Sequence, residues 1–186
     1  MHSLTKYIGG HGTSIGGIVV DGGNFDWTKN RKRQPLLNEP DQSYGGAIWA
    51  DAVPQLTGAN IPFVIRLRVV LLRDTGAPLA PFNAWQIIQG LETVGLRMKQ
   101  HCSNAEKVVT FLETQKKVKN VIYPTNHQGE IKERALRYMK GGYGSLVGMD
   151  VGTKENGAKF INNLKMLYHV ANIGDARSLA IHPATT

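Results

Sequence analysis

Three residues near the start of the chain, Ser3, Thr5 and Lys6, have types and a spacing that could perform chemistry together. The amine of Lys6 is a nucleophile that can form a Schiff base with the aldehyde of a phosphorylated ligand. The hydroxyl groups of Ser3 and Thr5 can donate hydrogen bonds to phosphate oxygens. These residues therefore predict a lysine-based site for a phosphorylated aldehyde.

The spacing Ser3-x-x-Lys6 also occurs where a lysine activates a serine nucleophile on a helix, as in β-lactamase-like enzymes. Here the glycine-rich stretch 8–17 (IGGHGTSIGG) follows the lysine. Each glycine inside a helix costs about 1 kcal/mol, so a helix does not continue comfortably there. No Ser-Asp-Asn or Lys-Thr-Gly motif follows, and this reading is therefore disfavoured. His11, between two glycines, is predicted to be a loop or packing residue rather than a base.

The composition is typical of a globular protein with a sizeable core, since 41% of the 186 residues are hydrophobic and 19% are charged. The most apolar run, residues 69–72, has an arginine on either side and is much shorter than the roughly 18 residues that a membrane helix needs. The start of the chain shows no signal-peptide pattern. We therefore expect a cytoplasmic protein with no membrane partner.

Cys102 is the only cysteine, which excludes a disulfide within the chain and a cysteine-based zinc site. It lies among apolar residues at helical spacing. We therefore predict a small buried hydrophobic residue rather than a reactive thiol, and we expect no metal site.

The formal net charge of +8 makes nucleic-acid binding a hypothesis to weigh. The densest basic cluster comprises Lys29, Arg31, Lys32 and Arg33, in a polar stretch that follows Trp27. The other basic residues are scattered, and no zinc-finger, helix-turn-helix or RNP-type pattern accompanies the cluster. We therefore predict a solvated loop and no nucleic-acid partner.

The hydrophobic pattern of the first part of the chain predicts four segments. Residues 15–20 (IGGIVV) predict a short buried strand, and residues 25–62, with little periodicity and several prolines, indicate a long irregular connector. Residues 61–73 predict a helix. In residues 83–115 apolar side chains recur every three or four positions, which predicts one long amphipathic helix.

After residue 115, strand-like and helix-like segments alternate, an order that indicates an α/β fold class. The predicted strands are residues 118–123, 145–151, 168–170 and 178–181, and the predicted helices are residues 131–139 and 156–166. A lone strand near the amino terminus normally belongs to a sheet, so its neighbouring strands are expected to lie outside this chain.

Longer stretches of the chain resemble one enzyme family. Residues 2–12 (HSLTKYIGGHG) closely resemble the cofactor-lysine segment of the cysteine/methionine-metabolism family of enzymes that depend on pyridoxal 5'-phosphate (PLP). Residues 71–84 (LLRDTGAPLAPFNA) and 90–98 (GLETVGLRM) resemble that family's interdomain helix region. Residues 171–179 (ANIGDARSL) and 182–186 (HPATT) resemble its substrate-side loop. The resemblance covers nearly the whole chain, with the order of segments preserved.

The resemblance implies a C-terminal fragment of a fold-type I PLP-dependent transferase. Residues 1–62 would be the end of the large cofactor domain with an irregular connector, residues 63–115 the interdomain helices, and residues 116–186 a truncated C-terminal α/β domain. In the family, an upstream half supplies a phosphate loop, a ring that stacks on the cofactor and an aspartate for the pyridine nitrogen, and an arginine for the substrate carboxylate follows downstream. The complete enzyme is expected to be a homo-oligomer, a dimer of dimers.

The resemblance also implies roles for individual residues. Lys6 would hold PLP and move protons at substrate carbons, Ser3 and Thr5 would bind the cofactor phosphate, and Asn172 would help to hold the carboxylate of an amino-acid substrate. The stretch 172–175 (NIGD) resembles the sulfhydrylase branch, because lyases and cystathionine synthases usually carry serine where Asn172 stands. The implied reaction is a γ-replacement in methionine and cysteine biosynthesis, in which O-acetyl-L-homoserine and sulfide give L-homocysteine and acetate.

Alternatives to this reaction stay open at the level of sequence. The same fold would also suit a cystathionine γ-synthase or a γ-lyase, and a fragment could instead be a non-catalytic interaction module. As a fragment, the chain is expected to be inactive by itself. Arg97 and His101, one helical turn apart, are expected to support the helix surface rather than a ligand, and Asp175 and Arg177 to pair with each other.

Overall fold

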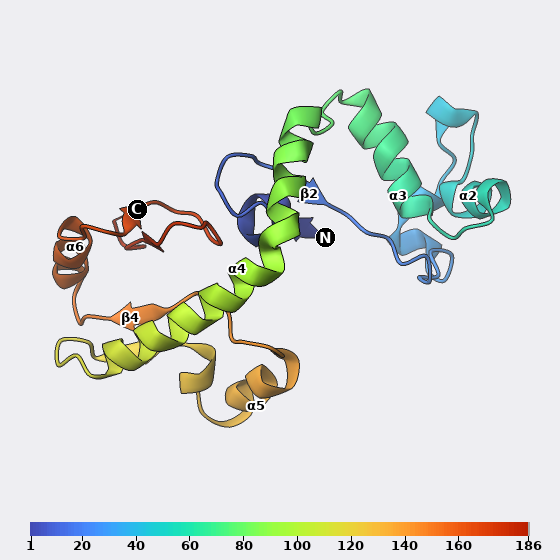
Figure 1. The fold of residues 1–186 in the computed structure, drawn as a ribbon. Helices are drawn as coiled ribbons and strands as arrows, with labels where there is room; N and C mark the ends of the chain where they lie inside the picture. The colour runs from blue at the N-terminus through green and yellow to red at the C-terminus, as the bar shows by residue number, and fades with distance from the viewer. Residues whose placement is uncertain (186) are drawn as a thin grey trace. The chain divides into compact units, whose positions relative to one another are not determined.

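The computed structural model describes residues 1–185 (Figure 1). Thr186, which ends both the predicted C-terminal domain and the family-like stretch 182–186, lies outside the described residues. The chain forms two compact units. The first contains residues 1–2 and 17–81, and the second contains residues 3–16 together with the chain from Phe82 onward. The predicted domain boundaries at residues 62 and 115 refer to a longer protein and stay a prediction.

Short helices of the first unit surround an apolar cluster whose buried members are Leu37, Trp49, Ala50 and Val53. Trp49 is also held by a hydrogen bond from its indole nitrogen to the carboxylate of Asp41, at 2.9 Å. The helical segments of this unit are η2 (Arg31–Arg33), α1 (Pro35–Asn38), η3 (Gln42–Tyr44), α2 (Trp49–Thr57), α3 (Pro62–Arg66) and η4 (Leu67–Leu72). The last two, α3 and η4, confirm the helix predicted over residues 61–73.

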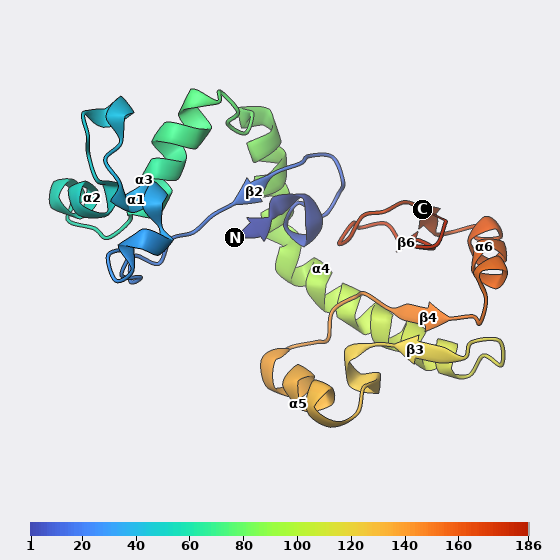
Figure 2. The same ribbon diagram turned by 180° about the vertical axis from the view of Figure 1, so that it is seen from behind.

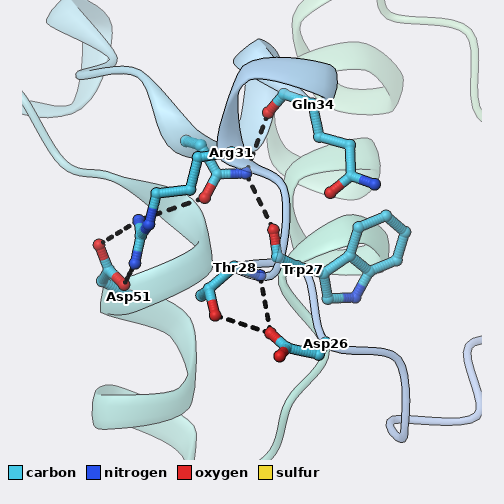
Figure 3. Close-up of polar contacts among 7 residues, drawn as sticks. Asp26, Trp27, Thr28, Arg31, Gln34 and Asp51 are labelled. Carbon is cyan, nitrogen blue, oxygen red and sulfur yellow. Dashed lines mark hydrogen bonds and ion pairs between the residues drawn. The ribbon is translucent and has the colours of Figure 1, made fainter.

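The basic cluster lies on the surface of the first unit, where all four of its side chains are exposed. Arg31 donates two hydrogen bonds to the carboxylate of Asp51, at 2.8 and 2.7 Å (Figure 3). Close by, Asp26 accepts hydrogen bonds from the backbone N–H and the hydroxyl of Thr28. The prediction that the cluster is solvated is therefore confirmed, but Arg31–Arg33 form the short 3₁₀ helix η2 rather than a loop. An exposed ion pair of this kind contributes little to stability.

The predicted buried strand at residues 15–20 is wrong in its extent and in its burial. Strand β2 covers only Gly17–Ile18 and pairs with the equally short β1 (His2–Ser3). Ile18 is 42% exposed and Val20 is 71% exposed. A two-stranded ladder buries its apolar side chains only where another element packs on it, and here they stay in solvent.

The prediction that residues 25–62 form an irregular connector is also wrong, because this stretch contains α1 and α2. The prediction treats the prolines as breaks, but Pro35 and Pro62 stand in the first turn of α1 and α3. There the missing N–H has no helical partner to lose, and the fixed φ of proline suits the helix. Pro54 lies inside α2 and is tolerated there.

The second unit is built on α4 (Pro81–Glu113), which confirms the long amphipathic helix (Figure 2). Strands β3 (Asn120–Ile122) and β4 (Gly148–Asp150) form an antiparallel pair in which Val121 lies opposite Met149. A parallel pair joins β5 (Tyr168–His169) to β6 (Leu179–Ala180). The remaining segments are η1 (Leu4–Ile8), η5 (Pro124–Asn126), α5 (Gly129–Tyr138) and α6 (Lys154–Asn162). The predicted α/β alternation is therefore confirmed, with shorter strands than expected.

The core of the second unit lies where the end of α4 covers β3. Its buried members are Ala105, Val109, Val121 and Tyr123. Tyr123 is only 1% exposed, and its hydroxyl donates to the carbonyl oxygen of Gly144 at 2.9 Å. Cys102 is 8% exposed on the same helix, which confirms its prediction as a small buried residue.

No single helix among residues 1–185 is long and apolar enough to cross a membrane; α2 and the α3–η4 segment pass the length and composition test only as a pair bent by 101°.

The buried hydroxyl of Tyr123 leads to a stability prediction. Tyr123→Phe leaves the Gly144 carbonyl without this donor in the core, so the free energy of unfolding should fall by about 1–2 kcal/mol. Urea unfolding followed by circular dichroism measures the change. Tyr138→Phe is the matched control, because Tyr138 is 69% exposed. Equal free energies of unfolding for the two variants would contradict the role assigned to the Tyr123 hydrogen bond.

Candidate active site

Lys6 lies in η1, a short helical segment that is broken by a kink at the lysine itself. The backbone of Lys6 departs from helical geometry, with φ −86° and ψ −128°. The N–H groups of Leu4 and Thr5 both donate to the carbonyl oxygen of Gly16, at 2.9 and 3.3 Å, and the N–H of Gly10 donates to that of Lys6 at 2.8 Å. The lysine is therefore held in a local conformation that an ordinary helix would not give it.

The amine of Lys6 donates a hydrogen bond to the side-chain oxygen of Asn172, with an Nζ–Oδ1 distance of 2.8 Å. The two predicted residues are 166 positions apart in the sequence, and the contact is partly buried. The structure therefore brings together the lysine and the asparagine that the resemblance had singled out separately.

The loop that carries Asn172 packs directly against the lysine segment. Gly174 has a φ of +77°, which favours glycine, and a Cβ there would lie 2.6 Å from the backbone nitrogen of Tyr7. The N–H of Ala176 donates to the carbonyl oxygen of Gly10 at 2.8 Å. These backbone contacts fix the distance between the two segments, and Asn172 reaches Lys6 as a consequence.

Asp175 anchors the same loop by pairing with Arg177, as expected from the sequence. The carboxylate is 5% exposed and accepts hydrogen bonds from Nε and Nη2 of Arg177, at 3.1 and 2.9 Å. These hydrogen bonds hold the pKa of Asp175 below its ordinary value, although burial acts in the opposite direction. The ionised pair therefore stiffens the turn that follows Asn172.

The two hydroxyls predicted to bind phosphate have different environments. Thr5 Oγ1 accepts a hydrogen bond from the N–H of Gly16 at 3.0 Å and donates to the Gly16 carbonyl oxygen at 3.3 Å. Ser3 is exposed, and its side chain does not cap the turn that follows it. Ser3 can therefore meet an anion directly, whereas Thr5 must first turn its proton away from Gly16.

Arg97 on α4 is a residue of this site that the sequence did not reveal. Its guanidinium donates to the carbonyl oxygens of Tyr7 and Ile8, at 2.8 and 3.1 Å, as well as to that of Gly90 within its own helix. The expectation that Arg97 supports the helix surface is incomplete, because it overlooks the contacts with the residues after Lys6. Its place in the family-like stretch 90–98 was the only available signal.

The ring of Tyr7 lies between two further groups of the second unit. Its hydroxyl shares a hydrogen bond of 2.7 Å with the hydroxyl of Ser145. Its ring meets that of His101 edge-on, with centroids 5.8 Å apart. Nε2 of His101 is buried and has no hydrogen-bond partner among residues 1–185. Burial, together with the positive charge of Arg97, lowers the pKa of His101 below its ordinary value.

The site residues fit a phosphorylated aldehyde, since a half-buried amine, an exposed hydroxyl at Ser3 and an amide at Asn172 are present. No group of three or more His, Cys, Asp or Glu side chains within residues 1–185 is arranged to hold a metal ion.

Comparison with known proteins identifies the family. The family model described as Cys/Met metabolism PLP-dependent enzyme matches residues 1–186, and the chain belongs to this family. The family prediction is therefore confirmed, and with it the expectation of a PLP-dependent class of enzyme.

Two proteins that are similar to this chain carry names of the sulfhydrylase branch. The O-acetyl-L-homoserine sulfhydrylase of Leptospira meyeri is 46% identical over 191 residues, which include all of this chain and 43% of that protein. A Campylobacter jejuni structure described as an O-acetylhomoserine (thiol)-lyase, which contains a pyridoxyl-lysine monophosphate, superimposes with a TM-score of 0.85 at 37% identity, covering 98% of this chain and 44% of that one. The cystathionine γ-lyase of Lactobacillus plantarum shares the fold at a TM-score of 0.69 and 24% identity, with 99% and 38% covered.

The chain spans less than half the length of these relatives. Its residues therefore form part of the fold that these proteins have, which confirms the predicted fold class.

The partly buried ring of His101, whose Nε2 is buried, leads to a pH prediction. Because the pKa of His101 is lowered in the folded state, the unfolded state binds more protons between the folded and the unfolded pKa values. Stability should therefore be fully present above the ordinary histidine pKa of about 6.5 and should fall as the pH drops below it.

Urea midpoints at pH 7.5 and at pH 5.5 test this expectation in the wild type and in His101→Gln. The variant should lose part of the pH dependence, whereas His169→Gln, at an exposed position, should retain all of it. The same pH dependence in the wild type and in His101→Gln would contradict the assignment.

Proposed function

We propose that the chain is part of an enzyme that performs a PLP-dependent γ-replacement, in which O-acetyl-L-homoserine and sulfide give L-homocysteine and acetate. Lys6 is the cofactor lysine in this proposal. The contact between Lys6 Nζ and Asn172 Oδ1 carries the proposal, because it joins the predicted cofactor residue to the predicted substrate residue. The 46% identity to a protein named as a sulfhydrylase supports the choice of reaction within the family.

The chain's own residues supply placement and proton transfer. PLP, when bound, supplies the electron sink for chemistry at the carbons next to the amino group. The Lys6 amine can take up a proton at Nζ from a nearby carbon and can return it to a carbon. Asn172 orients this amine through Oδ1, and its Nδ2 group remains to donate to a substrate carboxylate.

Ser3 and Thr5 bind the phosphate group in this proposal. The hydroxyl of Ser3 is exposed, and that of Thr5 has a long donor bond of 3.3 Å to Gly16, which an anion can replace at little cost. Both precede Lys6 on the same short segment, so a phosphate held by them would lie close to the base of the lysine side chain.

A chemical capture experiment tests the cofactor role of Lys6. The purified chain is incubated with PLP, reduced with borohydride and digested, and the modified peptides are identified by mass spectrometry. We expect the label at Lys6 in preference to exposed lysines, because the nearby hydroxyls add affinity for the phosphate. Lys6→Ala should lose the preferred label, and Lys154→Ala, at an exposed position, should keep it. A label that spreads evenly over the surface lysines would contradict the proposal.

The reaction is tested in a hybrid protein. In it, residues 1–186 replace the matching segment of the Leptospira meyeri relative, and the production of homocysteine from O-acetyl-L-homoserine and sulfide is measured. Lys6→Ala should lower kcat by about 10³-fold or more, because the nucleophile and proton carrier is gone. Asn172→Ala should raise KM for the amino acid by about tenfold, which corresponds to about 1.4 kcal/mol.

The matched control for Asn172 is Asn163→Ala, at an exposed position after α6, which should leave KM unchanged. Release of α-ketobutyrate in place of homocysteine would favour the γ-lyase alternative, and an inactive hybrid that still folds and binds PLP would favour the non-catalytic alternative.

The complete enzyme is proposed to assemble as a dimer of dimers. The mass of the hybrid protein, measured by sedimentation, tests this assembly.

A further inference from the structure

One guanidinium group, that of Arg97, connects the long helix α4 with the segment that carries the lysine. Nη1 donates to the carbonyl oxygen of Tyr7 at 2.8 Å, and Nη2 donates to that of Ile8 at 3.1 Å. The same group is anchored on its own helix by the carbonyl oxygen of Gly90 at 2.6 Å and the hydroxyl of Thr93 at 3.1 Å. Both partners in the lysine segment come directly after Lys6.

Glycines make room for this connection on both sides. A Cβ at Gly90 would collide with the carbonyl oxygens of Ile8 and Gly9, so the backbone of α4 touches the backbone of the lysine segment here. Gly10 has a φ of +72°, and a Cβ there would collide with the Arg97 guanidinium. The guanidinium therefore lies in the space that the missing side chain of Gly10 leaves open, while Gly90 lets the two backbones approach each other.

Only an arginine has the donors for these contacts. Its planar guanidinium presents five N–H groups in fixed directions, and here Nε, Nη1 and Nη2 all donate. A lysine at this position would bring a single ammonium group, which cannot reach carbonyl oxygens on two segments with the same geometry.

We propose that Arg97 is a positioning residue, which holds the backbone after Lys6 and thereby directs the Lys6 amine toward Asn172. This inference rests on the proposed function for its purpose, since a correctly directed amine matters for holding the cofactor. The hydrogen bonds from Nη1 and Nη2 restrain the residues that follow a lysine whose own backbone is not helical. Without them, the amine should leave Asn172 and become more accessible to solvent.

Acetylation of the chain measures the position of the amine without PLP. Trace acetic anhydride is added to the native protein, and the ratio of modification at Lys6 to that at exposed Lys154 is obtained by mass spectrometry. In the wild type the ratio should be low, because the Lys6 amine is partly buried and donates to Asn172. Arg97→Ala should raise it about tenfold, the change expected for about 1.4 kcal/mol of lost restraint.

Further variants separate positioning from general destabilisation. Arg97→Lys should also raise the ratio, because charge alone does not replace the planar donors. Guanidinium ion at low millimolar concentration should return the ratio of Arg97→Ala toward the wild-type value, whereas methylammonium should not. Thr93→Ala, which removes only one anchor, should raise the ratio by about twofold while its circular dichroism spectrum stays that of the wild type.

The matched controls are Val109→Ala, which loosens α4 in the core away from Arg97, and Arg134→Ala, which removes an exposed arginine. Both should leave the ratio at the wild-type value. An unchanged ratio in Arg97→Ala and Thr93→Ala, or an equal rise in Val109→Ala, would overturn the inference.

Capture with PLP and borohydride distinguishes this inference from the proposed function. In Arg97→Ala the capture at Lys6 should fall while acetylation of Lys6 rises, an opposite movement that simple loosening does not produce. If the wild type shows no preferred capture at Lys6 but Arg97→Ala raises its acetylation, the proposed function fails and the positioning role stands. If capture in the wild type is specific and Arg97→Ala changes neither measurement, the positioning role fails alone.

Discussion

The geometry of the site depends on the contact between the backbone of α4 at Gly90 and the backbone of the lysine segment at Gly9. Any side chain at Gly90 would separate the two segments, because its Cβ would lie only 2.2 Å from the Gly9 carbonyl oxygen. Arg97 follows Gly90 by seven residues, which is close to two helical turns, and therefore lies on the same face of the helix. The close approach at Gly90 brings its guanidinium within hydrogen-bond distance of the segment.

A second close approach, at Gly174, sets the position of the Asn172 loop on the other side of Lys6. The loop after Asn172 meets the backbone of Tyr7, and the ion pair between buried Asp175 and exposed Arg177 holds that loop in its turn. Each side of Lys6 is thus placed by backbone contact and then secured by one arginine. This arrangement suits a lysine that must keep one direction, because backbone contacts tolerate less displacement than contacts between flexible side chains.

The sequence predicted the helix α4 and the chemistry of Lys6 for different reasons. Apolar spacing over residues 83–115 identifies a helix by itself, and it was confirmed with a shift of two residues at each end. Lys6 and Asn172 were found by resemblance, since no periodicity relates two positions so far apart. Arg97 was read as a surface residue because helical spacing shows which residues share a face but not which distant segment packs on it. The sequence did not predict the helices around Trp49, because a proline is favourable in the first turn of a helix but disrupts a helix when it lies in the interior.

The residues that define the lysine geometry all belong to one compact unit. Lys6, Asn172, Tyr7, Ser145 and Arg97 lie in the second unit, and the hydrogen bonds that join them lie within that unit. The position of the amine is therefore a property of α4, the glycine-rich loop and the loop after Asn172. The two hydroxyls proposed to bind the phosphate are not yet arranged for it, because Ser3 is exposed and the hydroxyl of Thr5 is hydrogen-bonded to Gly16. In the proposed function, the direction of the amine is set by the chain's own contacts, and of the two hydroxyls only that of Thr5 would have to turn its proton away from Gly16 to meet a phosphate.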